Sequence, residues 1–199
     1  MSKKLPRSFY ERDDVVQISK DLIGKVLCTY FNGIQTSGKI VETEAYDGRN
    51  DKACHAHLNR RTKRTEVMYG SPGYAYVYLC YGIHHLFNIV TNREGLADAV
   101  LIRAIEPLEG ADEMVKRRGK EHLTKAIGNG PGKLSEALGI RKAHYGTDLT
   151  GNNIWVEDRN IEISENNIIS SERVGIDYAE EDADLPWRFS IKGSKWVSK

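Results

Sequence analysis

The chain has 199 residues, 40% hydrophobic and 29% charged, which is typical of soluble globular proteins and excludes wholesale disorder. Its 29 basic and 28 acidic residues leave a net charge of +1, which by itself argues against a nucleic-acid-binding protein, because such proteins usually carry an excess of basic residues. The three cysteines, Cys28, Cys54 and Cys80, are odd in number and widely spaced, which excludes a disulfide framework. Since neither a secretory signal nor a membrane-spanning apolar run is visible, we expect a cytoplasmic protein.

The N-terminal quarter predicts a helix followed by a hairpin. Phe9 to Ile23 carries apolar residues at helical spacing, and Lys25 to Phe31 is typical of a strand. Asn32-Gly33 is a hairpin turn signal, and Ile34 to Tyr46 predicts a second, long strand. The mixed alternation of that strand predicts a bend or bulge near Gly38.

The rest of the chain alternates predicted strands with turns and two helices. Asp47 to Gly70 has no clear period, and a loop of this length inside a domain is usually functional. We expect strands over Tyr74–Tyr81, His85–Thr91, Ala99–Glu106, Ile154–Val156, Ile161–Ile163, Arg188–Ile191 and Lys195–Val197, and helices over Ala111–Gly119 and Lys133–Leu138. This pattern predicts an α+β fold in a single compact domain, residues 1–199, with a curved, mostly antiparallel β-sheet flanked by a few helices.

A pair of carboxylates marks the end of the long strand. Side chains alternate along a strand, so Glu42, Glu44 and Tyr46 share one face. The pattern leaves two interpretations open: either this face is a solvated sheet edge, or it presents a general acid or base beside an aromatic platform.

Tyrosines recur in the next predicted strand. Tyr74, Tyr76 and Tyr78 point to one side, an arrangement that also occurs in aromatic cores. Tyr81 precedes Gly82 where the strand must turn, so its ring is a candidate wedge between nucleic-acid bases.

Cys54, His55 and His57 suggest a zinc site, but the H-x-E and C-x-x-C signatures of zinc deaminases are absent from the sequence. Neighbouring histidines such as His84 and His85 seldom both ligate one metal. We therefore expect no metal and no cofactor, and hydrogen-bonding roles for these histidines.

Two basic segments are candidate phosphate contacts. The cluster Arg60, Arg61, Lys63 and Arg64 is either a solvated loop or a phosphate-binding surface. Lys133 follows a glycine-rich turn that suits a phosphate, although the P-loop pattern is not met.

Several segments also occur in the order and spacing of a known family. They are Ile40–Tyr46, His55, Tyr76–Gly82, Asn88-Ile89, Leu101–Gly110, Gly130–Leu134, Arg188-Phe189 and Gly193–Ser198. From about Phe9 to Ser198 the chain resembles the alkyladenine (3-methyladenine) DNA glycosylase family.

The resemblance implies specific roles for the matching residues. It implies that Glu44 is the general base that activates water, and that Tyr46, His55 and Tyr78 form the walls of a pocket for a flipped base. It further implies that Tyr81 is the wedge that enters the minor groove.

Two more positions carry over in the same way. Asn88 would crowd the 2-amino group of guanine, and Arg103 would lie near the backbone of the target nucleotide.

The implied activity is monofunctional base excision of alkylated purines from damaged double-stranded DNA, with deaminated and etheno purines as further candidate substrates. We expect a monomer without membrane contact. Two rivals remain: a non-catalytic nucleic-acid-binding module, and a metalloenzyme that uses Cys54, His55, His57 and Glu44.

The neutral total charge hides an uneven distribution. Residues 111–144 hold eight basic against four acidic residues, and residues 157–184 hold ten acidic residues against two arginines. Because fields act within about 8 Å at physiological salt, the local charge matters more than the sum. We expect the acidic segment 157–184 to lie away from the pocket.

Overall fold

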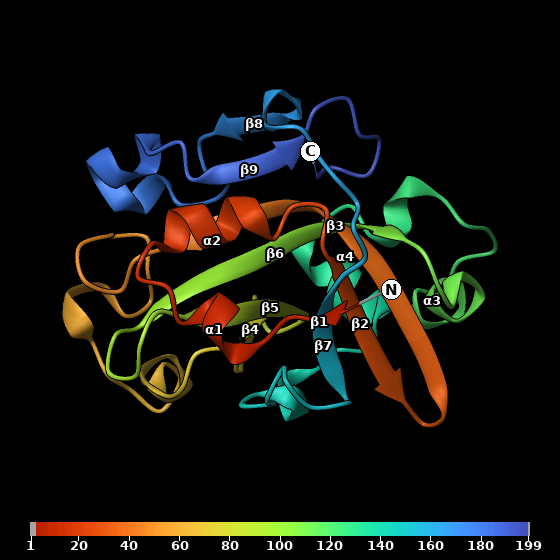
Figure 1. Cartoon of the computed structure of the whole chain (residues 1–199), viewed down its shortest axis with the longest axis horizontal. Helices are drawn as coiled ribbons and strands as arrows, with labels where there is room; N and C mark the ends of the chain where they lie inside the picture. The colour runs from red at the N-terminus through yellow and green to blue at the C-terminus, as the bar shows by residue number, and fades with distance from the viewer. Residues whose placement is uncertain (1–2, 199) are drawn as a thin grey trace.

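The computed structural model describes residues 3–198. Within them, nine strands form one open, curved sheet in which every pairing is antiparallel, flanked by four short helices (Figure 1). The main strand order is β1-β7-β2-β3-β6-β5-β4, and β9 pairs with both β3 and β8. The predicted α+β fold with a mostly antiparallel sheet is confirmed.

The elements have the following bounds. The strands are β1 Lys3–Lys4, β2 Val26–Phe31, β3 Ile34–Tyr46, β4 Ala75–Cys80, β5 His84–Thr91, β6 Asp98–Pro107, β7 Ile154–Asp158, β8 Ile168–Ser171 and β9 Arg188–Ile191. The helices are α1 Arg7–Tyr10, α2 Val15–Asp21, α3 Ala111–Arg117 and α4 Pro131–Ala137. The 3-10 helices are η1 His57–Asn59, η2 Glu66–Tyr69, η3 Lys125–Ile127, η4 Lys142–His144, η5 Glu165–Asn167 and η6 Asp177–Asp184.

The predicted single helix over residues 9–23 is wrong, because two helices, α1 and α2, occupy this region. Asp14 separates them: its backbone is extended, and its carboxylate accepts a hydrogen bond from Gln17 N–H at 2.9 Å. A side chain that satisfies a free amide of the first turn starts a new helix at that point.

Two predicted strands are also wrong. Residues 161–163 are irregular, and their apolar residues pack without pairing: Ile161 lies against the Trp155 cluster, and Ile163 lies over Gly24. Residues 195–197 form a turn in which Trp196 packs on Val41 of β3. Strands β1 and β8 were not expected from the sequence.

The irregularity in β3 lies further along the strand than predicted. The register with β6 shifts on either side of Glu42, whereas Gly38 keeps regular pairing with both neighbours. At Gly38 a Cβ atom would lie 2.6 Å from Ile105 Cδ1, so glycine is required there by close packing across strands.

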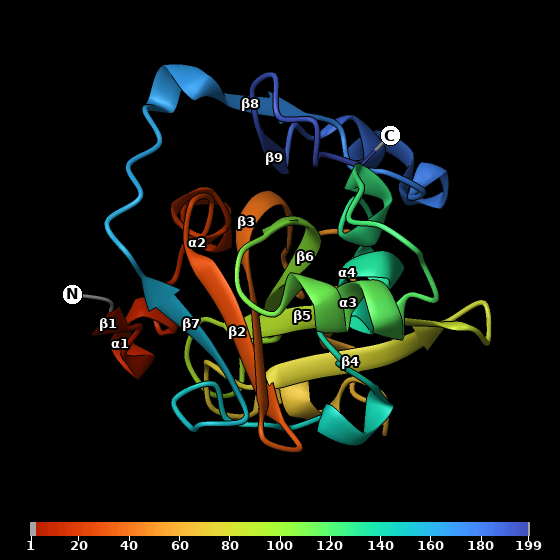
Figure 2. The same ribbon diagram turned by 90° about the vertical axis from the view of Figure 1, so that its right-hand side faces the viewer.

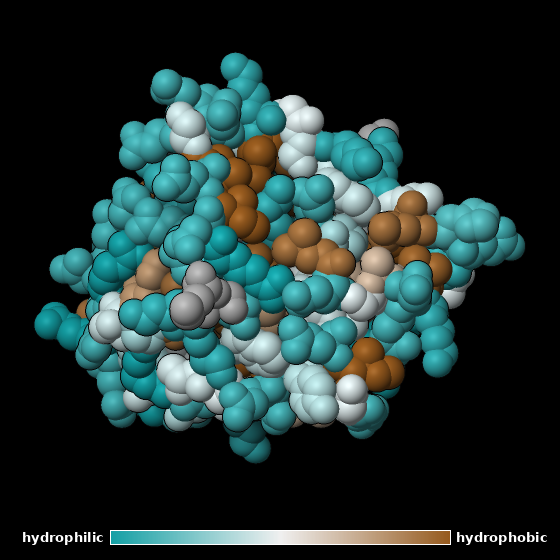
Figure 3. Space-filling model, turned by 45° about the vertical axis from the view of Figure 1, so that its right-hand side comes forward, coloured by the Kyte–Doolittle hydropathy of each residue, from teal (hydrophilic) through white to brown (hydrophobic). Residues whose placement is uncertain are grey.

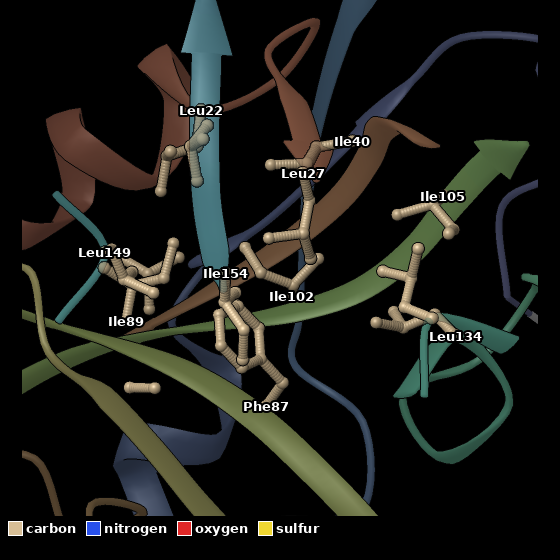
Figure 4. Packing of buried hydrophobic residues seen from close by; sticks show 14 of the residues in the cluster. Leu22, Leu27, Ile40, Phe87, Ile89, Ile102, Ile105, Leu134, Leu149 and Ile154 are labelled. Carbon is tan, nitrogen blue, oxygen red and sulfur yellow. The ribbon is translucent and has the colours of Figure 1, made fainter. Parts of the chain in front are cut away.

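The main core lies between the sheet and the helices α2 and α4. Figure 4 shows apolar side chains from β2, β3, β5, β6, β7 and α4 pointing toward one another. The fully buried members include Leu27, Ile40, Phe87, Ile102 and Leu134. This packing holds β3, β6 and β5 side by side, so it also fixes the polar side chains on their other face.

Two surface features complete the fold. The tip of the β4–β5 hairpin projects from the body of the molecule (Figure 2). The face drawn in Figure 3 is largely hydrophilic, with separate small apolar patches. Among the described helices, none has the length and apolar character needed to cross a membrane.

Candidate active site

Glu44, near the end of β3, is fully buried, and three donors hold its carboxylate. The Tyr46 hydroxyl donates to Oε2 at 2.7 Å, and Arg103 Nη1 donates to the same oxygen at 3.2 Å. The main-chain N–H of Val174 donates to Oε1 at 2.8 Å. Burial, and then the charge of Glu44, raise the pKa of Tyr46 well above its usual value, so its hydroxyl stays protonated as a donor.

Glu42 forms the second half of this buried network. Its Oε1 accepts from Arg103 Nε at 3.2 Å and from Ser198 Oγ at 2.8 Å, and its Oε2 accepts from Ser198 N–H at 2.7 Å. The strands β6 and β9 both pair with β3 here, so β3 is not an edge strand, and both carboxylates are buried rather than solvated. Arg103 therefore bridges two carboxylates whose remaining oxygens are hydrogen-bonded, as buried charges require.

A cavity of about 750 Å³ opens beside this network. Its wall includes Tyr46, Arg103 and Val174, the three groups that hold Glu44, so the carboxylate lies directly behind the cavity wall. The structure brings all the predicted pocket residues to this wall, namely Tyr46, His55, Tyr78, Asn88 and Arg103. Asn88 is oriented by hydrogen bonds from its Nδ2 to the main-chain carbonyls of Tyr76 and Leu86, at 3.1 and 3.5 Å.

The orientation of His55 is set by two partners. Its Nδ1 lies 2.8 Å from Tyr76 Oη, and its Nε2 lies 3.0 Å from Arg64 Nη2. A guanidinium can only donate, so Nε2 accepts and Nδ1 carries the proton. The ring meets Tyr78 edge-on, with centroids 4.8 Å apart. Desolvation by burial, and then the charge of Arg64, lower the pKa of His55 to about 4, so the imidazole is neutral at pH 7.

We expect His55 to make the protein less stable in acid. In the unfolded chain this imidazole protonates near its ordinary pKa of 6.5, but in the folded protein only near 4. Its contribution is therefore full above about pH 6.5 and falls by up to about 3 kcal/mol as the pH approaches 4. Urea unfolding at about pH 7.5 and about pH 4.5 measures this loss, which should be smaller in His55→Asn than in the wild type. Equal losses in the two proteins would contradict the assignment.

Arg173 supports the site from a segment to which the sequence assigned no role. Its side chain is completely buried and forms a bidentate ion pair with Asp51, with Nη2 at 2.8 Å from Oδ1. It also donates to the carbonyl of Ala45 at 2.9 Å and lies 4.8 Å from the ring centroid of Tyr46. Because Val174 follows directly, this anchor places the Val174 N–H on Glu44. The only signal in the sequence was that Arg173 is one of just two arginines in an acidic segment.

The prediction that residues 157–184 lie away from the pocket is wrong. Val174, Gly175, Ile176 and Tyr178 all line the cavity. The buried Arg173 ion pair draws this segment across the site, while the acidic side chains that follow turn to Lys52, whose Nζ lies 2.5 Å from Glu180 and 2.7 Å from Glu181. Lys52 thus offsets part of the negative charge of this segment.

Tyr81 lies at the tip of the β4–β5 hairpin, at the mouth of the cavity. Its side chain is 91% exposed, and its backbone φ is 51°, a left-handed conformation that is unfavourable for a bulky residue. Gly82 follows with a φ of 73°, and Ile83 is 71% exposed. The turn therefore presents two apolar side chains to solvent, and such local strain is often found at functional sites.

The five predicted phosphate-binding residues lie in different surroundings. Arg60 and Lys63 are exposed. Arg61 pairs with Glu66 through its Nε and Nη2. Arg64 lies at the cavity, 4.6 Å from the ring centroid of Tyr78, and Lys133 lines the cavity with its Nζ 3.0 Å from Asn129 Oδ1. The last two can therefore reach a ligand in the cavity.

The residues considered as metal ligands are not gathered in one place. Cys54 is buried with its Sγ near the carbonyl of Ala97, and His55 is engaged by Tyr76 and Arg64. Across residues 3–198, no group of three or more His, Cys, Asp and Glu side chains has an arrangement that could hold a metal ion.

Comparison with known proteins identifies similar chains. The model of the family described as methylpurine-DNA glycosylase matches residues 8–195. A "Putative 3-methyladenine DNA glycosylase" of Clostridium acetobutylicum is 50% identical, over 98% of this chain and 97% of its own length. Proteins of the same name from Alkaliphilus oremlandii and Chlamydia felis are 47% and 48% identical, over 98% and 97% of this chain and 99% and 100% of their own lengths.

Proposed function

The chain belongs to the methylpurine-DNA glycosylase family, and on that premise we propose that it is a monofunctional DNA glycosylase that releases alkylated purines from duplex DNA. The target nucleotide would be flipped into the cavity, and water would attack the sugar carbon of the N-glycosidic bond. The abasic site that results would be the starting point of base excision repair.

The observation that carries this proposal is the buried carboxylate behind an aromatic cavity. An ionised carboxylate has about four lone-pair positions. The three hydrogen bonds from Tyr46, Arg103 and Val174 occupy three of them in Glu44, so one position is left for a water molecule. The rigid donors also fix the carboxylate in place, which is what a general base needs.

The chemistry balances without another reactant. The C1′–N bond breaks, and its electron pair goes to the base nitrogen, so a purine made cationic by alkylation leaves as a neutral base. Water adds to the sugar carbon and gives its proton to Glu44. The negative charge of Glu44 also stabilises the oxocarbenium-like sugar as positive charge develops there.

The cavity suits a cationic purine. Tyr46 and Tyr78 line it, and the electron-rich face of each ring attracts a cation by about 0.5–2 kcal/mol. The guanidinium of Arg173 already lies over Tyr46 and that of Arg64 over Tyr78, which supports the view that these rings favour cations at their faces.

The direct test is base release from alkylated duplex DNA in the presence of a chelator. Methylated purine bases and abasic sites should form without strand cleavage. Loss of activity on chelation, together with stoichiometric zinc in the purified protein, would favour the metalloenzyme instead. Binding of DNA without base release would favour the non-catalytic module.

Tyr81→Ala is expected to reduce flipping and to weaken binding to lesion-containing DNA. The exposed ring would fill the space left by the flipped base, and this contact offsets part of a flipping cost of a few kcal/mol. Stopped-flow fluorescence of a base analogue beside the lesion measures flipping, with Tyr30→Ala, an exposed tyrosine outside the cavity, as the matched control. Unchanged flipping and affinity in Tyr81→Ala would remove the wedge role.

A further inference from the structure

A second groove lies on the other side of the β4–β5 hairpin. Its volume is about 760 Å³, and it shares only His84 and Gly132 with the cavity at Glu44. The two residues pack closely: a Cβ on Gly132 would lie 3.0 Å from the His84 side chain. The hairpin and the first turn of α4 therefore form a partition between the cavity and the groove.

The groove is built largely from the basic segment 111–144, which the proposed mechanism does not use. Its two glutamates are each held by an arginine: Glu113 pairs with Arg117 at 3.1 Å, and Glu136 pairs with Arg118. Arg141, which lines the groove, and the following residue, Lys142, are exposed. The positive charge in this part of the groove is therefore available to an anion.

Two histidines in the groove are oriented as hydrogen-bond donors. His144 Nδ1 accepts from Arg141 N–H at 2.9 Å, and His85 Nδ1 accepts from Lys142 N–H at 3.2 Å. When Nδ1 accepts, a neutral imidazole carries its proton on Nε2. Stacking on Phe31, with centroids 4.4 Å apart and the planes 8° from parallel, fixes the His144 ring. Both imidazoles thus offer an Nε2–H donor without needing to be protonated.

We propose that this groove binds backbone phosphates of the DNA strand complementary to the one that carries the lesion. The inference rests on the proposed function: with the flipped nucleotide in the cavity and Tyr81 at the gap in the stack, the complementary strand lies across the hairpin. Arg141 and Lys142 supply the charge for these phosphates, and His85 and His144 supply Nε2–H donors. The apolar tip residue Ile83, which also lines the groove, lies beside this strand.

The experiment compares the double variant Arg141→Gln/Lys142→Gln with the wild type on a duplex that contains a stable abasic-site analogue. Each lost phosphate contact lowers the slope of log affinity against log salt by about 0.9, so the slope should fall by nearly two and the affinity about tenfold at low salt. Lys120→Gln/Lys125→Gln is the matched control, because it removes the same charge from exposed lysines of the same segment that neither line the groove nor, like Lys142, adjoin a residue that lines it. The control should change binding less than threefold, and saturating single-turnover base release should be unchanged in both variants.

Methylphosphonate linkages, which replace charged phosphates with neutral groups, show which DNA strand contacts the groove. In the complementary strand they should weaken binding of the wild type but cause little further loss in the double variant. In the lesion strand they should weaken both proteins equally. The inference is overturned if the double variant binds DNA as tightly as the wild type or as the control variant. It is also overturned if only linkages in the lesion strand, and not those in the complementary strand, cause a smaller loss of affinity in the double variant than in the wild type. Failure of the proposed function would be distinguishable, since base release would then be absent from the wild type itself.

Discussion

Glu44→Gln is expected to slow single-turnover base release by about 10²–10⁴-fold, while affinity for abasic-site DNA stays within about twofold of the wild type. Glutamine keeps the size and the acceptor oxygen of the side chain, but it cannot take a proton from water. Arg103 keeps Glu42 as its carboxylate partner, so the buried network does not lose its only counter-charge. The change therefore removes the base while Arg103 keeps one carboxylate partner.

Glu42→Gln is the matched control for this prediction. It makes the same chemical change on the same strand face, again beside Arg103, but at a carboxylate whose oxygens are held by Ser198 at the C-terminal end. We expect this control to lower stability and to slow base release less than tenfold. Turnover retained in Glu44→Gln, or an equal loss in both variants, would contradict the role of Glu44 as the base.

Arg173→Ala should destabilise the folded protein by about 3–5 kcal/mol, because it leaves the Asp51 carboxylate buried without its partner. The loss of the contacts with the rings of Tyr46 and Trp187 adds to this cost. Urea unfolding monitored by tryptophan fluorescence measures the free energy of unfolding. In the fraction that remains folded, base release should also be slow, since the Val174 N–H no longer has a fixed place on Glu44.

A double-mutant cycle separates the ion pair from general disruption at Arg173. Asp51→Asn removes the unpaired charge, so Asp51→Asn combined with Arg173→Ala should be less unstable than the sum of the two single variants predicts. Arg173→Lys should recover part of the stability but less of the rate of base release, because an ammonium group cannot bond Asp51 in a bidentate way. A loss below about 1 kcal/mol in Arg173→Ala would show that the pair is not a structural anchor.

Local pattern was enough to predict several parts of the fold. The Asn32-Gly33 turn forms as expected, with both residues at positive φ, and β3 spans the predicted Ile34–Tyr46. The strands β4, β5 and β6 begin and end within one residue of the predicted bounds. These features depend on backbone conformations and side-chain alternation that residues close in the sequence determine. They can therefore be predicted without knowing which distant segments pack or pair with them.

Other features depended on contacts between distant segments. The apolar residues of 161–163 resemble a strand, but they pair with no strand of residues 3–198. The short strand β8 forms because β9 lies beside it. The charge distribution also failed to predict where the acidic segment 157–184 lies. The buried ion pair between Arg173 and Asp51, which are 122 positions apart, determines its path.

The sequence by itself determined that Glu42, Glu44 and Tyr46 share one face of a strand, because the side-chain period of a strand is two. It could not decide whether that face was solvated or buried. Only the tertiary structure decided this, since Arg103 of β6, the Val174 N–H and Ser198 come from far along the chain to hold the two carboxylates. A charged group is stable in the interior only when such partners surround it, and long-range partners leave no local pattern in the sequence.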